Sequence, residues 1–142
     1  MIAYADTGFL ISVYGHDANS SVARSLLASK PVLLLTPFGE GEFTNAIELL
    51  VFRKQWTRPE GRVIQEAFLQ HQASGVFRSE SFGPEVWRRA LSLSRRHTAT
   101  IGTRMLDILH VASALVAKAD VFYTFDKRQA KLSRAEGLEV QP

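Results

Sequence analysis

Four acidic residues, Asp6, Glu42, Asp107 and Asp126, carry the clearest chemical signal in this sequence. Asp107 stands out because its neighbours in MLDILHVASALV, residues 105–116, are almost wholly apolar, which is typical of a helix buried in a core. An unpaired buried carboxylate is costly, so it is neutralised, ion-paired or bound to a metal. Because the chain has no cysteine, any metal would be held by Asp, Glu, His or backbone oxygen.

Three of the acids also have purely structural interpretations. Asp6 and Asp126 each precede a predicted helix and could serve only as its N-cap, and Gln129 stands at the capping-box position after Asp126. Glu42 is expected in the first turn of a helix, where the helix dipole favours an acidic side chain without any further role.

Asp107 could pair with Arg104, one turn earlier on the same helix. His110, one turn after Asp107, is more often a satisfied core histidine than a ligand. Asn45, one turn after Glu42, is either a hydrogen-bond partner behind a site or a polar surface residue. Each acid can therefore be explained without function when it is considered alone.

The pattern along the chain predicts an α/β fold. Short β-rich runs alternate with longer helical patterns, in the order β-α-α-β-α-α-(β)-α-α-β-α-β, with helices on both faces of a mainly parallel sheet. The segment GVFRSESF is either a short strand or an extended linker. Gly137 is expected to cap the last helix in the left-handed conformation. The strands are expected at 2–5, 32–35 and 121–125, with a closing strand near 138–140.

This arrangement would bring the acids together. Asp6 follows the first strand, Asp126 follows the strand at 121–125, and Glu42 lies near the start of the helix after 32–35. The carboxyl ends of the strands line the ligand crevice in open α/β sheets, and Asp107 could face the same rim. Four unrelated structural roles would then have to coincide at one edge, so we favour a cation site.

Composition sets the context for that site. The 142 residues fit one domain, and 46% hydrophobic with 22% charged residues is typical of a globular protein. The net charge of +3 and pI near 9.5 mildly suggest a polyanionic partner, although the basic pairs are individually typical of solvated helix faces. No signal peptide or apolar run of about 20 residues is visible, so we expect a cytoplasmic protein without a membrane span.

Three segments resemble the PIN domain, and more narrowly the VapC-type ribonuclease toxins of bacterial type II toxin-antitoxin systems. They are MIAYADTGFLISVY, GEFTNAIELL and RMLDILHVASALVAKADVFYTFDKRQAKLSRAEGLEV. The D-x-x-H-x-A-x-A-L and T-F-D-K-R-Q elements of the last segment are the most specific, while residues 55–100 contribute little. The resemblance implies a single PIN-like domain over 1–142, with a three-layer α/β/α fold and a central, mainly parallel sheet.

The resemblance also implies a Mg²⁺- or Mn²⁺-dependent endoribonuclease. Besides the four acids, two positions match the family pattern: Thr124 is the hydroxyl residue before Asp126, and Asn45 is the polar residue after Glu42. Many relatives have another acidic or amide residue two positions after the fourth acid, where this chain has Arg128, so the number of metal ions stays open. The family's catalytic, metal-binding quartet maps onto Asp6, Glu42, Asp107 and Asp126.

Family resemblance further implies an RNA substrate, a small inhibitory antitoxin and a homodimer. Exposed aromatic residues would serve the antitoxin contact, with candidates among Phe38, Phe43, Phe52 and Trp56, although single aromatics are more often core residues. The sequence identifies neither the dimer face nor the RNA that is cut, because loop shape and groove charge decide the latter.

Two other classes of function remain open. The chain could be a PIN-fold RNA-binding or assembly module without catalysis, which the complete acid quartet argues against. It could also be a phosphatase with Asp6 as nucleophile, which is disfavoured because Gly8, rather than a second Asp, stands two residues later. DNA is a further candidate substrate.

Overall fold

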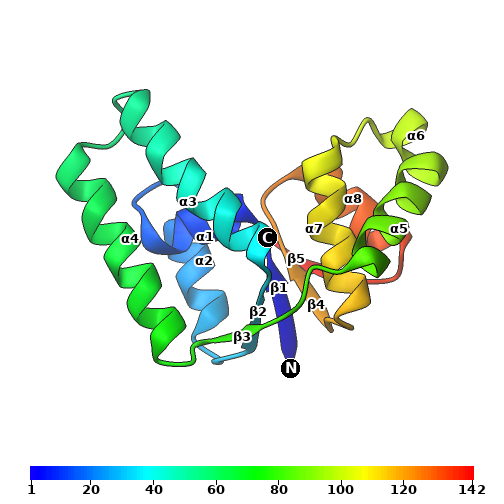
Figure 1. The fold of residues 1–142 in the computed structure, drawn as a ribbon, viewed down its shortest axis with the longest axis horizontal. Coiled ribbons are helices and arrows are strands. Elements are labelled where there is room, and N and C mark those ends of the chain that lie inside the picture. The colour runs from blue at the N-terminus through cyan, green and yellow to red at the C-terminus, as the bar shows by residue number, and fades with distance from the viewer.

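The computed structural model describes all 142 residues, and its centre is a five-stranded sheet (Figure 1). The strand order is β3-β2-β1-β4-β5, and every neighbouring pair is parallel. The predicted α/β fold is therefore confirmed, and the sheet is wholly rather than mainly parallel. The strands are β1 (Ile2–Ala5), β2 (Val32–Leu35), β3 (Phe77–Ser79), β4 (Val121–Tyr123) and β5 (Glu139–Gln141).

Helices cover both faces of the sheet, so the molecule has three layers (Figure 1). On one face lie α1 (Thr7–Tyr14), α2 (Ser20–Leu27), α3 (Pro37–Phe52) and α4 (Arg58–Ala73). The other face carries α5 (Pro84–Leu93), the π-helical turn η1 (Ser94–Thr98), α6 (Ala99–Ile101), α7 (Met105–Val116) and α8 (Lys127–Ala135). None of these helices has the length and apolar content that a membrane crossing requires.

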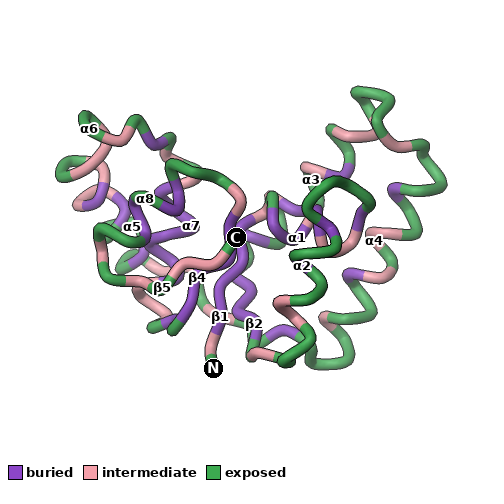
Figure 2. The backbone as a smooth tube through the Cα atoms, turned by 180° about the vertical axis from the view of Figure 1, so that it is seen from behind, coloured by how far each residue is buried: buried purple, intermediate pink, exposed green.

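The strands alternate between two hydrophobic cores because successive side chains point to opposite faces. In β1, Ala3 and Ala5 pack with α1, α3 and α4, whereas Tyr4 packs with α5, α7 and α8. Figure 2 shows burial concentrated along the strands, with exposure rising toward the outer helices. Each fully buried large apolar side chain, such as Phe9 or Phe122, contributes about 1.5–3 kcal/mol to folding.

Several local predictions are confirmed. The segment left open between 75 and 82 contains a strand, β3. Gly137 has a φ of 83° and follows α8 in the expected left-handed position, where its N–H donates to Arg134 O and the next N–H donates to Ser133 O. The helical segment that begins at Pro84 consists of α5, the π-helical turn and α6 in succession.

Candidate active site

The register of β1 against β4 brings Asp6 and Thr124 together at the carboxyl edge of the sheet. Ala5 pairs with Tyr123, and the Asp6 N–H donates to Tyr123 O at 3.1 Å. Asp6 is 2% exposed, and both of its carboxylate oxygens have donors. Oδ1 accepts from Phe9 N at 2.7 Å as the N-cap of α1, and Oδ2 accepts from the Thr124 hydroxyl. The capping role proposed for Asp6 is therefore real.

Burial raises the pKa of Asp6, although the donors from Thr124 and Phe9 oppose that shift. Thr124 is itself buried and also accepts from Asp126 N at 2.9 Å. One hydroxyl thus joins the acid at the end of β1 to the backbone of the acid that follows β4. Thr124, expected from sequence as a supporting residue, connects two of the four acids.

Glu42 is held in a network that crosses from α3 to α7. Its Oε2 lies 2.8 Å from His110 Nε2 and accepts from the Thr7 hydroxyl at 3.0 Å. On the other side of the ring, His110 Nδ1 lies 3.0 Å from the Tyr4 hydroxyl. Tyr4 and His110 are 1% and 2% exposed, so water cannot replace these partners freely. The interpretation of His110 as a satisfied core histidine is correct, but its partner is a candidate catalytic acid.

The hydrogen-bond chemistry of this network assigns the donors. Glu42 can only accept when ionised, so His110 Nε2–H donates to it, while Nδ1 of the same ring is paired with the Tyr4 hydroxyl. The bond from His110 lowers the pKa of Glu42, whereas burial raises the pKa of Tyr4 to about 12. Glu42 is therefore an ionised carboxylate whose position is set by His110.

The expectation that Glu42 lies in the first turn of its helix is wrong. Thr36 caps α3 by accepting from Gly39 N at 3.0 Å, and Pro37 occupies the first helical position. The acid in the first turn is consequently Glu40, and Glu42 lies in the second turn. Because the helix dipole acts mainly within the first turn, it does not explain why Glu42 is acidic.

Asp107 and Asp126 line a cavity of about 400 Å³ at the same edge of the sheet. The other lining residues are all basic: Arg104, Lys127 and Arg128. Asp126 caps α8, with Oδ1 accepting from Arg128 N and from Gln129 N, both at 2.8 Å, while its Oδ2 makes no hydrogen bond within the protein. Asp126 thus caps α8 with one carboxylate oxygen, while its other oxygen has no hydrogen-bond partner in the protein.

Asp107 is half-buried in the first turn of α7. Its Oδ1 lies 3.4 Å from the Gln129 side-chain amide, so Gln129 does not complete a capping box with Asp126. Burial raises the pKa of Asp107, and the nearby charge of Asp126 raises it further. Arg104 lines the same cavity but forms no ion pair with Asp107, so the pairing considered from sequence does not occur.

The four acids thus lie at one edge of the sheet but in two settings. Asp107 and Asp126 share the open cavity, whereas Asp6 and Glu42 are tied into hydrogen-bond networks behind it. No three acidic or histidine side chains are grouped as a metal site would require. Asn45 is exposed on α3 and makes no hydrogen bond to any of the acids.

Sequence reasoning missed several residues that shape this edge. Tyr4 and Thr7 flank Asp6 by two and one positions and looked like ordinary strand and helix residues. Gln129 was considered only as a cap, yet it is buried beside Asp107. The signal that was available is the D-x-x-H spacing, which fixes His110 on the same helix as Asp107 and so points to partners across the sheet.

The aromatic residues considered for partner contacts have different surroundings. Phe52, at the end of α3, is 82% exposed, whereas Phe43 is fully buried in the core. Phe38 is partly buried and its ring lies 4.8 Å from the His110 ring, and Trp56 is partly buried against the first core. Of the four, Phe52 is the one exposed aromatic, and Phe43 is excluded as a contact residue.

Comparison with known families identifies this arrangement. The family described as PIN domain matches residues 3–135. The chain belongs to the PIN domain family. This confirms the resemblance of its N-terminal strand, its third helix and the segment after Asp107. No curated protein matches the sequence of this PIN domain.

Solved structures similar to this PIN domain include toxins of the VapC type. Mycobacterium tuberculosis VapC20, a toxin described as cleaving the sarcin-ricin loop, has 25% identity and a TM-score of 0.72 over 99% of both chains. VapBC2 of Rickettsia felis, bound to a promoter DNA fragment, has 16% identity and a TM-score of 0.67, covering 99% of this chain and 98% of that one. FitAcB of Neisseria gonorrhoeae has 18% identity and a TM-score of 0.69, covering 100% and 97%.

Proposed function

We propose that this PIN domain is a metal-dependent endoribonuclease that hydrolyses RNA phosphodiester bonds, as the toxin of a type II toxin-antitoxin pair. The observation that carries the proposal is the cavity lined by Asp107 and Asp126. It lies beside a third, buried acid whose pKa is raised by desolvation. Carboxylates gathered in this way repel one another, and a hard cation relieves that repulsion.

The donor set suits Mg²⁺, and Mn²⁺ as a substitute. Mg²⁺ prefers one or two carboxylates together with water and substrate phosphate oxygens, and the cavity offers two carboxylates on an open surface. Asp107 and Asp126 would hold the ion most directly, with Asp6 and Glu42 behind them. When bound, such an ion lowers the pKa of a coordinated water and offsets charge on the leaving oxygen.

The chain's own residues would supply orientation. Thr124 holds Asp6 and the backbone of Asp126 in a fixed relation, so both acids keep one geometry when charge enters the site. His110 and Thr7 hold Glu42 ionised, as a carboxylate that can accept a proton or a hydrogen bond from the attacking water. Preorganised groups of this kind accelerate a reaction because they need no rearrangement as charge develops.

The setting of the reaction follows from the similarity to VapC20 and VapBC2. VapC20, at 25% identity, is described as a toxin that cleaves the sarcin-ricin loop, and this similarity supports RNA as the substrate class that we propose here. VapBC2 is a toxin-antitoxin complex, which supports a small antitoxin as a partner. A homodimer and action in the cytoplasm belong to the same proposal.

Two alternatives are less well supported. A catalytically inactive PIN module would not need the open oxygens of Asp107 and Asp126 beside one another. A phosphatase with Asp6 as nucleophile is disfavoured because Asp6 is buried and both of its oxygens already accept hydrogen bonds. A phosphoenzyme formed on a small phosphate ester would revive the second alternative.

Incubation of the purified protein with labelled single-stranded and structured RNAs tests the proposal, with matching DNAs beside them. Each substrate is incubated with Mg²⁺, with Mn²⁺ and with EDTA, and Asp107→Asn serves as the control variant. We expect cleavage of RNA that needs the metal and is lost in the control. RNA left intact under every condition, while Mg²⁺ still raises the thermal stability, would instead support the binding module.

A further inference from the structure

The charged cavity contains more positive than negative side chains, and none of them is paired. Arg104, Lys127 and Arg128 face Asp107 and Asp126 across it, yet no ion pair within 4.0 Å joins any of the five. The three cations therefore have no carboxylate partner in the cavity, and the two carboxylates have no basic partner.

Basic residues elsewhere on the same face behave differently. Glu136, at the end of α8, accepts from Arg96 at 2.8 and 3.1 Å and from Arg89 at 3.5 Å. His97 lies 2.6 Å from the same carboxylate. That cluster is satisfied within the protein, so its charges have a structural partner. The cavity cations lack such a partner although two carboxylates lie next to them.

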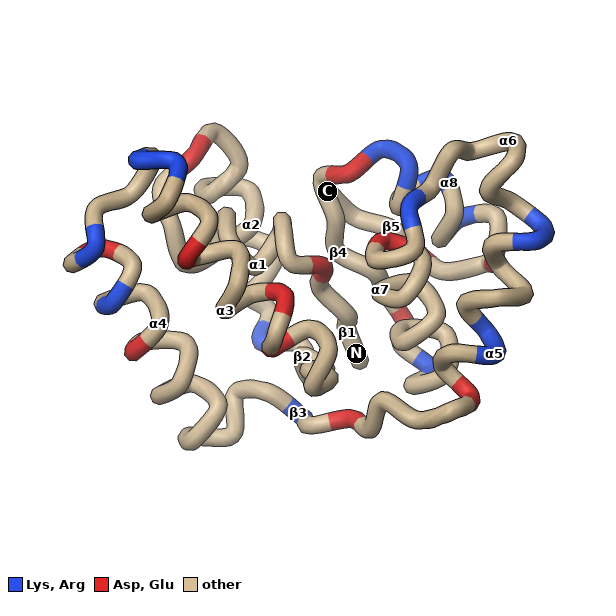
Figure 3. Tube along the Cα trace, turned by 45° about the horizontal axis from the view of Figure 1, so that its top comes forward, with Lys and Arg blue, Asp and Glu red and all other residues tan.

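A hydrogen bond to the backbone and a left-handed glycine position two of these cations, Arg128 and Arg104. Arg128 Nη1 donates to Gly102 O at 3.3 Å, which ties the start of α8 to the loop between α6 and α7. Gly102 has a φ of 76°, a conformation that glycine adopts without strain, and it turns the chain so that Arg104 leads into α7. Figure 3 shows basic residues at the start of α8 and along this side of the molecule.

Across the edge, the helix α3, which carries Glu42, contains three acidic residues and no Lys or Arg over Pro37–Phe52. The attraction of an anionic strand to the cavity therefore comes from the α7 and α8 side rather than from α3. Unpaired Arg and Lys side chains beside open carboxylates suit a phosphate group, which can contact the basic side chains while a metal ion binds the carboxylates.

We propose that Arg104, Lys127 and Arg128 form a phosphate-binding site that holds the backbone of a single RNA strand beside Asp107 and Asp126. The inference rests on the proposed function, because it assigns the substrate contact of that same site. Arg presents a planar, always charged fork to phosphate oxygens, and Lys adds a mobile point charge. Binding at this site does not require the metal, since all of its donors come from the protein.

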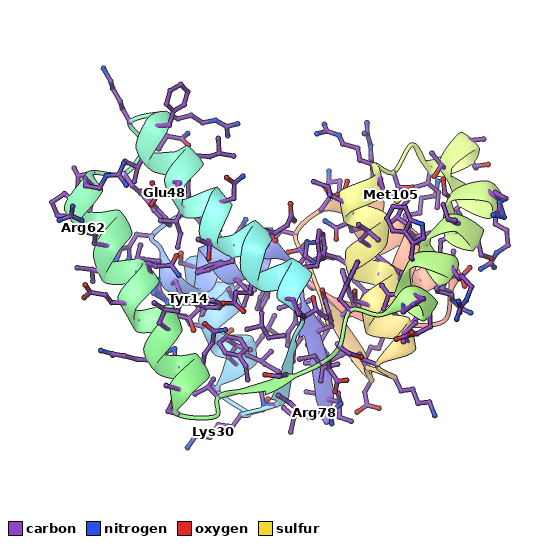
Figure 4. The ribbon with its side chains drawn as sticks, in the orientation of Figure 1. Tyr14, Lys30, Glu48, Arg62, Arg78 and Met105 are labelled. Atoms are coloured by element: carbon purple, nitrogen blue, oxygen red, sulfur yellow. The ribbon has the colours of Figure 1, made fainter.

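The test measures binding rather than cleavage. The wild-type chain, the triple variant Arg104→Gln, Lys127→Gln, Arg128→Gln, and Arg62→Gln are each titrated into labelled single-stranded RNA in EDTA, over a series of salt concentrations. Arg62→Gln is the control for the loss of one remote charge, because Arg62 is an exposed, unpaired arginine on α4, on the outer side of the other helical layer (Figure 4). Circular dichroism and thermal melting establish that each variant is folded.

We expect wild type and Arg62→Gln to bind alike and the triple variant to bind more weakly. The plot of log K against log salt has a negative slope, and each lost phosphate contact makes it less steep by about 0.7 for a single strand. The loss of three contacts therefore makes it less steep by about 2. An unchanged slope and affinity in the folded triple variant, or an equal loss in Arg62→Gln, would overturn the inference.

A cleavage assay in Mg²⁺ on the same wild-type preparation separates the two proposals. If the wild type cleaves RNA and the triple variant binds RNA as tightly as the wild type, the nuclease proposal is supported and the phosphate-binding site is contradicted. If the triple variant binds RNA more weakly and the wild type cleaves no RNA, the phosphate-binding site is supported and the nuclease proposal is contradicted. Single-stranded DNA of the same sequence serves as a further arm, because a phosphate-backbone contact predicts the same loss in the triple variant for DNA.

Discussion

His110 Nε2 lies 2.8 Å from Glu42 Oε2, joining residues that are 68 positions apart in the sequence. The bond crosses from α7 to α3 and is supported by Tyr4 in β1 behind the ring. An acid that lies in the second turn of a helix, with no cap or dipole role, thus has its position set by a buried imidazole. His110 is therefore a positioning residue for Glu42, and it need not touch the substrate.

Replacement of His110 should lower activity more than it disturbs the fold. We expect His110→Ala to reduce RNA cleavage by about 10–100-fold, the usual cost of losing a partner behind a site. His110→Gln, which keeps an N–H donor, should recover part of the rate. His71→Ala is the control, because His71 Nδ1 makes a similar 2.7 Å contact with the Tyr14 hydroxyl away from the site. Equal losses in the two alanine variants would contradict the positioning role.

Removal of the Tyr4 hydroxyl should act on stability. In Tyr4→Phe, Nδ1 of the buried His110 ring loses its hydrogen-bond partner, which costs about 1–3 kcal/mol. The aromatic ring at position 4 stays in the core, stacked on the Phe122 ring with their centroids 5.7 Å apart. Urea unfolding should give a lower midpoint with an unchanged slope. A midpoint equal to that of the wild type would mean that the hydroxyl does not satisfy the histidine.

Thr124 should need its hydroxyl rather than its methyl group. Thr124→Val keeps the shape but removes the donor to Asp6 and the acceptor for Asp126 N, so we expect lower stability by about 1–3 kcal/mol and reduced cleavage. Thr124→Ser keeps both bonds and should retain most of the activity. Paired measurements of melting temperature and cleavage rate test this, and a serine variant as impaired as the valine variant would argue against the hydroxyl bridge.

The raised pKa of Asp6 predicts a pH-dependent difference in stability. Because burial places its folded pKa above the unfolded value, ionisation of Asp6 costs stability in full above the folded pKa. The cost falls as the pH drops from the folded toward the unfolded pKa, and it is absent below the unfolded pKa. Asp6→Asn lacks the charge at every pH. Without metal, the melting temperature of Asp6→Asn relative to wild type should therefore be highest near neutral pH and should decline toward acidic pH. A difference that stays constant with pH would contradict a raised pKa.

Metal addition should stabilise the wild type and not the Asp107 variant. A ligand that binds only the folded state at 100 times its dissociation constant adds about 2.7 kcal/mol. We expect Mg²⁺ or Mn²⁺ to raise the melting temperature of the wild type, with little effect on Asp107→Asn, and EDTA to reverse the rise. The same rise in both proteins would mean that the cation binds elsewhere.

Most of the fold could be predicted from sequence because its signals are local. Apolar runs mark the strands, and Gly137 marks the end of α8. The start of α3 was placed too late, because Thr36 and Pro37, its cap and first residue, were not taken into account. The π-helical turn after α5 could not be predicted, because its residues continue the same amphipathic pattern. The choice between strand and linker at β3 depended on pairing with β2, which is not visible in the segment itself.

The site was predicted in part. The placement of acids after strands predicted their common edge, since parallel strands end together. The division into an open pair and two supported acids could not be predicted, because it depends on tertiary partners such as Tyr4 and Thr7. The place of Lys127 and Arg128 in the cavity could not be predicted either, because a basic pair at a helix start is typical of a solvated face in the sequence.

The nature of the cleavage products tests the central claim most directly. Labelled RNA is cut in Mg²⁺ by the wild-type chain in ¹⁸O-enriched water, and the fragment ends are analysed by mass spectrometry. Attack by a water held at the acidic edge predicts a phosphate monoester carrying one solvent oxygen on one fragment and a free hydroxyl on the other, with no products in EDTA. A 2′,3′-cyclic phosphate formed equally well in EDTA would contradict the account, because the RNA's own 2′-hydroxyl would then be the nucleophile.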